Sequence, residues 1–302
     1  MNDFVRHTPK ENHPMKLTRR TAALLLALAG CASAQASKDT TTATPTATQA
    51  PHKQEVRDLL KAIETGESGP MAVINPNKYV QHNLAAKDGI AGLTEFLAQI
   101  PKGSARVNTV RVFQDGDLVF AHSDYNIFGP KVGFDVFRFE DGKIVEHWDN
   151  LQEKPASANP SGHTMTDGPA EARELEQTEA NKRLVRSFLE DILVNGRMDK
   201  LAGYFGGDTY IQHNPRIADG LSGLGAGLKA MADSGIALKY ERIHRVLGEG
   251  NFVLAAGEGQ LGGKPFSFYD LFRVENGKIA EHWDTVEAIP PKDQWRNNNG
   301  KF

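Results

Sequence analysis

The chain has 302 residues, of which 39% are hydrophobic and 24% are charged. These fractions are ordinary for soluble globular proteins, so fibrous and wholly disordered classes are excluded, and the length allows about two domains of roughly 100–150 residues. A formal net charge of −3 gives no overall electrostatic reason to bind nucleic acid or an acidic membrane surface. The single cysteine, Cys31, excludes an intramolecular disulfide and a cysteine-rich zinc site.

Residues 1–36 have the layout of a secretory signal. A short basic segment follows Met15, which is a second possible start, and the apolar run at residues 22–29 comes next. Basic and then apolar segments in this order are typical of signal peptides, and the run is too short to span a bilayer as a permanent helix. The adjacent Arg19 and Arg20 also resemble a twin-arginine signal, which exports folded proteins.

The apolar run ends in Leu-Ala-Gly-Cys at residues 28–31. This segment resembles the lipobox of bacterial lipoproteins, in which the cysteine is acylated and becomes the mature N-terminus. We therefore expect an exported protein in the periplasm or cell envelope, anchored to the membrane by a lipid on Cys31. The alternative is ordinary secretion with cleavage after Ala-Gln-Ala at residues 34–36. Residues 37–52 lack a core-forming pattern and predict a flexible tether.

The remainder of the chain contains one module twice. Tyr-Val-Gln-His-Asn at residues 79–83 recurs as Tyr-Ile-Gln-His-Asn at 210–214. Residues 134–149 recur as 269–284, with eleven of sixteen positions identical. Chance does not produce this agreement, so the sequence predicts a tandem duplication. The predicted parts are domain 1 at 53–154, a linker at 155–176, domain 2 at 177–290 and a tail at 291–302.

Each copy predicts helices first and a meander of strands afterwards, which is an α+β arrangement. Apolar residues at helical spacing predict helices near 56–63, 90–100, 185–192 and 221–231. Strands are predicted at 106–113, 118–127, 134–140 and 143–150. Asp115-Gly116 and Asp141-Gly142 separate consecutive strands, and such pairs favour hairpin turns because both residues tolerate a positive φ.

The order of elements, the Tyr-x-Gln-His-Asn segment and the Asp-x-Phe-Arg-x-x-x-Gly-Lys-Ile-x-Glu-His-Trp-Asp hairpin resemble the SnoaL-like polyketide-cyclase family. That family has the cone-shaped fold of nuclear transport factor 2 and ketosteroid isomerase. The resemblance implies two tandem cone-shaped α+β barrels, each a curved antiparallel sheet wrapped on helices. Proteins of this fold often pair sheet to sheet, which implies an intramolecular pseudo-dimer. A flexible linker would also allow two separate domains, and further oligomerisation stays open.

Regular pairing across the turn at 141–142 predicts which side chains share a face of the sheet. Asp135, Glu146 and Trp148 would share the pocket face, and His147 and Asp149 would lie on the outer face, where one domain packs against the other. A β-bulge would reverse this assignment on one strand.

An aspartate on an apolar pocket face is partly desolvated and can act as a base for a proton next to a carbonyl. The resemblance implies the same role for an aspartate in this strand, assisted by a histidine on the preceding strand, without a metal. The alternative is that these aspartates only accept hydrogen bonds. Amide and imidazole donors in the Tyr-x-Gln-His-Asn segment could steady an enolate, or could simply satisfy the backbone at a chain bend.

The predicted catalytic residues are Asp135, His122, His82, Asn83, Asp270 and His213. The predicted pocket residues are Tyr79, Gln81, Phe137, Trp148, Tyr210, Gln212, Asn214, Phe272 and Trp283. His122 corresponds to Ala256 in the second copy, so copy one retains the fuller apparatus. We expect no cofactor and no metal ion, since no third ligand at metal spacing is evident beside His147 and Asp149.

These patterns favour an exported acid/base enzyme acting on a small carbonyl compound, as a cyclase, aldol-type enzyme, isomerase or dehydratase. The alternative is a non-catalytic envelope lipoprotein that binds a small apolar ligand or a protein partner. Removal of residues 1–30 would leave a net charge of −6, which argues against a nucleic-acid partner.

The lipid anchor gives a direct prediction. In the exported parent protein, mass spectrometry of the mature N-terminal peptide should show acyl chains on Cys31. The Cys31→Ala variant should carry none and should leave the membrane fraction. An unmodified parent N-terminus that begins after Ala36 would contradict lipidation and indicate ordinary secretion.

Overall fold

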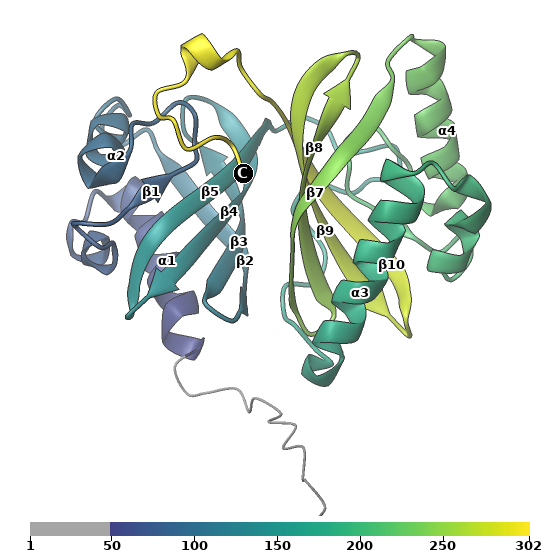
Figure 1. Cartoon of the computed structure of the whole chain (residues 1–302), viewed down its shortest axis with the longest axis horizontal. Coiled ribbons are helices and arrows are strands. Elements are labelled where there is room, and N and C mark those ends of the chain that lie inside the picture. Colours follow the sequence, from purple (N-terminus) through teal and green to yellow (C-terminus); the bar gives the residue numbers. More distant parts are fainter. Residues whose placement is uncertain (1–48) are drawn as a thin grey trace, which may run out of the picture. The chain divides into compact units, whose positions relative to one another are not determined.

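The computed structural model describes residues 49–302, which contain two successive α+β domains (Figure 1). The predicted signal, the lipid attachment at Cys31 and most of the predicted tether lie outside the described residues. Among the described residues, no helix is both long and apolar enough to cross a membrane.

The two domains repeat the same order of elements. Domain 1 consists of α1 (Gln49–Thr65), β1 (Val80–Gln81), α2 (Gly89–Leu97), β2 (Arg106–Asp115), β3 (Leu118–Asn126), β4 (Pro130–Glu140) and β5 (Lys143–Glu153). Domain 2 consists of α3 (Thr178–Phe188), β6 (Ile211–Gln212), α4 (Gly220–Asp233), β7 (Leu238–Glu249), β8 (Phe252–Leu261), β9 (Lys264–Glu275) and β10 (Lys278–Ala288). Short 3-10 or π-helical segments lie at Gly69–Val73, Leu175–Gln177, Leu189–Val194, Met198–Tyr204 and Lys292–Gln294.

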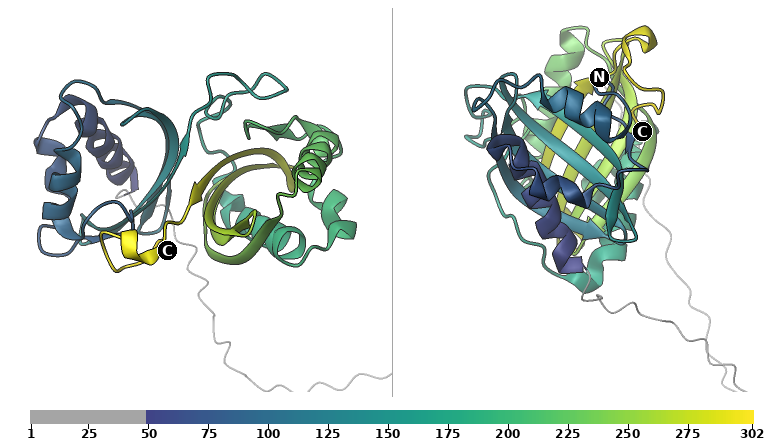
Figure 2. Two further views of the ribbon diagram at one scale, coloured as in Figure 1. Left: turned by 90° about the horizontal axis from the view of Figure 1, so that it is seen from above. Right: turned by 90° about the vertical axis from the view of Figure 1, so that its left-hand side faces the viewer.

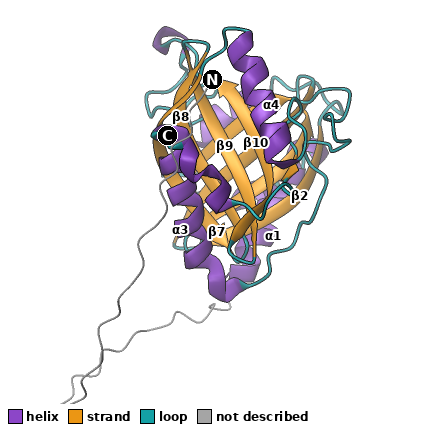
Figure 3. Cartoon of the chain, turned by 90° about the vertical axis from the view of Figure 1, so that its right-hand side faces the viewer, coloured by secondary structure: helices purple, strands orange, loops and turns teal. Residues whose placement is uncertain are grey.

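Each domain has one five-stranded sheet, in the orders β1-β5-β4-β3-β2 and β6-β10-β9-β8-β7. The short first strand of each sheet is parallel to its neighbour, and the other pairs are antiparallel. Figure 2 shows both sheets strongly curved, and Figure 3 shows α3 and α4 against the sheet of domain 2. The predicted fold class, two tandem cone-like α+β domains, is confirmed.

The helices fill the concave side of each sheet. In domain 1, the buried side chains Val56, Leu59 and Leu60 of α1 belong to one apolar cluster with Phe137 and Ile144 of the sheet. Their spacing of three and four residues places them on one helical face, as predicted. An equivalent cluster around the end of α3 fills domain 2. Burial of these apolar faces holds each helix against its sheet.

The hairpin between β4 and β5 contains a β-bulge, a possibility that the sequence could not decide. Phe139 pairs with Ile144, but Arg138 pairs with Glu146, so Val145 is the extra residue. The turn itself is as predicted, with φ of +50° at Asp141 and +71° at Gly142. An extra residue reverses the face of every following side chain on the strand. In domain 2 the same shift lies between Ile279 and Glu281.

The predicted assignment of faces on β5 and β10 is therefore wrong. His147 and Asp149 share the concave face with Asp135, because Asp135 pairs with Asp149 and Phe137 with His147. Trp148 lies on the opposite face, in the cluster where the two sheets meet. Trp283 occupies the same place in domain 2.

The outer faces of the two sheets pack against each other, so the predicted intramolecular pairing is present and the alternative of two separate domains is wrong. Phe113 stacks on Phe252 across the interface with ring centroids 4.5 Å apart. The guanidinium of Arg245 lies 3.9 Å from the ring centre of Trp148, and that of Arg111 lies 4.3 Å from Trp283. The described residues thus form one compact unit.

The segment after each sheet crosses to the other domain. After β10, the tail lies along the edge of domain 1 (Figure 1), where the Asn297 and Asn299 side chains donate hydrogen bonds to the backbone carbonyls of Asn83 and Gln81. After β5, the linker does the same in domain 2, where Asn159 donates to the Gln212 carbonyl. The tail therefore covers the edge strand β1, and the linker covers the edge strand β6.

Asn150 tests the strength of the interface. Its buried side chain donates to the carbonyl and hydroxyl of Thr285 and accepts from the hydroxyl of Ser267. Asn150→Ala leaves these partners unsatisfied, so we expect a loss of about 1–3 kcal/mol in the free energy of unfolding, measured by chemical denaturation. The exposed Asn108→Ala serves as the control and should change stability by less than about 0.5 kcal/mol. Equal effects of the two substitutions would contradict this role for Asn150.

Candidate functional site

A cluster of hydrogen-bonded polar side chains lies on the concave face of domain 1. The Asp135 carboxylate accepts a hydrogen bond from the Tyr125 hydroxyl at 2.5 Å, and its other oxygen lies 3.1 Å from His147 Nε2. His147 Nδ1 lies 3.0 Å from Oε1 of Gln81. Asp135, His147 and Asp149 are 6%, 8% and 4% exposed. The cluster is therefore closed to bulk water.

The backbone fixes where the protons of this cluster lie. Gln81 Oε1 accepts the backbone N–H of Asn83 at 2.8 Å, so this amide atom must be the oxygen. His147 Nδ1 faces the same oxygen and must therefore carry a hydrogen. His147 Nε2 and Asp135 then share one proton, either as an imidazolium with a carboxylate or as a neutral imidazole with a carboxylic acid.

Asp149 completes the cluster. One of its oxygens accepts from the Asn83 side chain at 2.5 Å, and the other lies 3.4 Å from Lys301 Nζ. Lys301 also contacts Glu287 at 2.6 Å. Burial disfavours the charged ammonium, but the carboxylates of Glu287 and Asp149 outweigh it and raise the pKa of Lys301. The tail thus places the buried, positively charged ammonium of Lys301 beside Asp149 of domain 1.

Domain 2 repeats the arrangement with the corresponding residues. The Tyr240 hydroxyl donates to Asp270 at 2.9 Å, and His282 lies 3.0 Å from Asp270 and 2.9 Å from Gln212. Burial disfavours the imidazolium, but the bond to Asp270 and the charge of Asp284 raise the pKa of His282. Burial also raises the pKa of Asp284, which accepts from Asn214 at 2.6 Å.

The buried tyrosines act as hydrogen-bond donors or as walls. Burial and the neighbouring Asp135 raise the pKa of Tyr125 well above its usual value, so the phenol keeps its proton. Burial has the same effect on Tyr79 and Tyr210, whose hydroxyls accept from the amides of Gln81 and Gln212. Phe137 and Phe272, which are predicted pocket residues, lie against the rings of His147 and His282 with centroid distances of 4.6 and 4.8 Å.

Two of the predicted catalytic histidines, His82 and His213, lie on the outer side of the sheets instead of the concave side. The chain alternates faces along β1, so Gln81 and Asn83 point inward and His82 points outward. His82 Nε2 lies 3.0 Å from Glu146 and its ring stacks on Trp148. His213 contacts Glu281 and Trp283 in the same way. Their predicted place beside the aspartates is wrong.

His122 is also on the outer face. It pairs with Phe134 across β3 and β4, whereas Asp135 pairs with Ala121. The ring stacks on Phe134, and Nδ1 lies 2.9 Å from a guanidinium nitrogen of Arg111. His122 and Asp135 therefore lie on opposite faces of the sheet, and the expectation that His122 assists Asp135 is wrong.

Sequence reasoning missed six members of the two clusters: Tyr125, His147, Asp149, Tyr240, His282 and Asp284. The tyrosines could have been found, because Tyr125 lies at an even spacing from Ala121, the residue paired with Asp135. The histidines and second aspartates depend on the bulge, which also brings the third potential ligand that was not evident from spacing. Each Asp-His-Asp set has one ligand atom per residue within 4.8 Å of the others.

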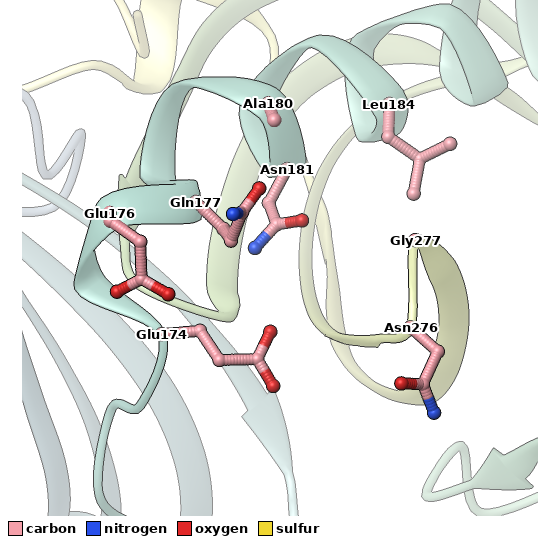
Figure 4. A pocket seen from close by; sticks show the side chains of 8 residues that line it. All are labelled: Glu174, Glu176, Gln177, Ala180, Asn181, Leu184, Asn276 and Gly277. Carbon is pink, nitrogen blue, oxygen red and sulfur yellow. The ribbon is translucent and has the colours of Figure 1, made fainter.

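The described part of the chain also has an open groove of about 490 Å³ beside the start of α3 (Figure 4). Its lining comprises Glu174, Glu176, Gln177, Ala180, Asn181, Leu184, Asn276 and Gly277. A smaller cavity of about 80 Å³ lies under the linker, between Lys154 and Met165. Neither is lined by the aspartates of the two clusters.

Comparison with known proteins assigns the family. Residues 56–147 and 185–282, together more than half of the chain, each match the SnoaL-like domain. The chain belongs to the SnoaL-like family. Its two SnoaL-like domains each contain one Asp-His-Asp cluster. No curated protein matches the chain.

Solved structures match over about one domain at a time. TsrD from Streptomyces laurentii is 20% identical over 34% of this chain and 90% of its own, with a TM-score of 0.30. An LEH-like epoxide hydrolase from M. tuberculosis is 24% identical over 37% of this chain and 85% of its own, with a TM-score of 0.29. An NTF-2 like protein of unknown function from Burkholderia xenovorans LB400 is 18% identical, with coverages of 41% and 99% and a TM-score of 0.33.

His122 gives a pH-dependent prediction. Burial, together with the charge of Arg111, holds the pKa of His122 well below its usual value of about 6.5. The folded state therefore excludes a proton that the unfolded state binds, so stability falls as the pH drops below about 6.5. We expect this loss to approach about 1.4 kcal/mol per pH unit for this group.

The matched variant is His122→Gln, which keeps an acceptor for Arg111 but cannot be charged. Denaturation between pH 7.5 and 5 should show a shallower loss of stability in the variant than in the parent. Parallel pH profiles would contradict the buried, neutral state of His122.

Proposed function

We propose that this SnoaL-like protein is an exported acid/base enzyme that moves a proton next to the carbonyl group of a small compound, with Asp135 of domain 1 as the base. The proposal rests on the contact of 3.1 Å between Asp135 and His147 Nε2, on a face where Gln81 fixes the hydrogen of Nδ1. A carboxylate paired with an imidazole of fixed tautomer can take up a substrate proton and return it without a change of side-chain geometry.

The neighbouring groups fit the charge that such a reaction develops. When Asp135 accepts the proton, negative charge moves to the carbonyl oxygen of the substrate as an enolate forms. Asn83 is a neutral donor within the same cluster, and the second hydrogen of its side-chain amide can bond to that oxygen while the first stays on Asp149. Tyr125 donates its hydroxyl hydrogen to Asp135 and holds that carboxylate in place. His147 keeps its Nδ1 hydrogen on Gln81 throughout, so its orientation stays constant.

A second candidate is a non-catalytic envelope protein that binds a small apolar ligand or a protein partner. The closure of both clusters favours this role, since Asp135 is only 6% exposed and Asp270 only 3%. An enzyme must open this site for its substrate, whereas a structural or binding protein need not. Export, indicated by residues 1–36, is common to both candidates.

Exchange of deuterium next to a carbonyl tests the enzymatic role before the natural substrate is known. A panel of small ketones and aldehydes is incubated with the protein in D₂O, and exchange is followed by proton NMR. Asp135→Asn should reduce the exchange rate by about 100-fold or more. Asp270→Asn, tested separately, reports whether domain 2 contributes.

The matched control is Asp124→Asn, an aspartate on β3 whose carboxylate pairs with Lys154 outside the cluster. Its exchange rate should equal that of the parent. Exchange that survives both Asp135→Asn and Asp270→Asn would contradict the mechanism. A ligand that copurifies with the protein and exchanges no proton would favour the binding role.

A further inference from the structure

The two clusters differ at one atom. In domain 1, the second oxygen of Asp149 faces the ammonium of Lys301. In domain 2, the corresponding Oδ1 of Asp284 is buried and has no hydrogen-bond partner among the described residues. Asp284 is only 8% exposed. A buried carboxylate oxygen without a partner is costly, so it calls for a proton or a cation.

The crossing segments explain the difference. In domain 1, the Gly300 carbonyl lies 2.9 Å from His82 Nδ1, and the next residue is Lys301. In domain 2, the Thr164 carbonyl lies 2.8 Å from His213 Nδ1, and the next residue is Met165. Met165 is buried and uncharged. The linker therefore has the thioether of Met165 at the position where the tail has the ammonium of Lys301.

The remaining atoms of the domain 2 cluster are arranged as a ligand set. Asn214 holds one oxygen of Asp284, Gln212 takes the Nδ1 hydrogen of His282, and Tyr240 donates to Asp270. Such partners orient the ligands of a metal ion from outside. Once the proton that His282 shares with Asp270 leaves, the lone pair of His282 Nε2 and one oxygen each of Asp270 and Asp284 face one another, all within 4.8 Å.

We propose that domain 2 binds one divalent transition-metal cation between Asp270, His282 and Asp284, and that this cation has the place that Lys301 has in domain 1. Two carboxylates and one neutral imidazole suit Zn²⁺ or Mn²⁺ better than Ca²⁺ or Mg²⁺, which prefer oxygen ligands. Binding displaces the proton that His282 shares with Asp270. The proposal does not depend on the reaction assigned to domain 1.

The test is metal binding by residues 37–302 after removal of metals with a chelator, with Zn²⁺ alone as the probe in titration calorimetry. We expect one high-affinity ion per chain. Asp284→Asn should weaken binding at least tenfold, and Met165→Lys should do the same by supplying an internal cation. Lys301→Met should allow a second ion to bind, at Asp149. Circular dichroism of each variant checks that it is folded.

A cluster at the linker, His163, Asp167 and His213, supplies the competing site. If His163→Ala removes the bound Zn²⁺ while Asp284→Asn keeps it, the ion belongs to that cluster and the proposal is wrong. Failure of the folded parent to bind Zn²⁺ or Mn²⁺ would also overturn it, and would leave Asp284 as a protonated acid. Zinc X-ray absorption with a nitrogen and oxygen shell that includes a single imidazole would support it.

Discussion

Each domain depends on one hydrogen bond from the backbone to a buried amide. The N–H of Asn83 fixes the oxygen of Gln81, and the N–H of Asn214 fixes that of Gln212 in the same way. The amide oxygen then requires a hydrogen on the facing imidazole nitrogen. The other imidazole nitrogen, Nε2, then faces the aspartate. The protonation chemistry of both clusters is thus set by the main chain of the Tyr-x-Gln-His-Asn segment.

The duplicated sequence predicts the fold well because its signals are local. Apolar spacing locates the four helices, Asp-Gly pairs locate the turns of domain 1, and the repeat locates the domains. The contents of the site are predicted only in part, since they depend on strand register. Asp135, Asn83 and Gln81 lie where expected. The extra residue Val145 places His147 on the concave face and turns Trp148 to the outer face. No local sequence pattern predicts such a bulge, because packing on both faces of the sheet determines its position.

The duplication also explains the crossed segments. Each sheet ends beside its partner, so the chain that leaves it lies next to the other domain's edge strand. Asn159 and Asn299 make equivalent contacts on β6 and β1, although they do not occupy matching positions in the repeat. The two sheets make matching contacts at the interface, whereas the linker and the tail differ in sequence. Where the tail carries the charged Lys301, the linker carries the uncharged Met165.

His147 and His282 each donate their Nδ1 hydrogen to a glutamine oxygen and turn Nε2 toward an aspartate. Long-range ¹H–¹⁵N correlation NMR of the histidine side chains measures this directly. We expect a protonated Nδ1 in both residues of the folded protein. An unprotonated Nδ1 in either residue would contradict it.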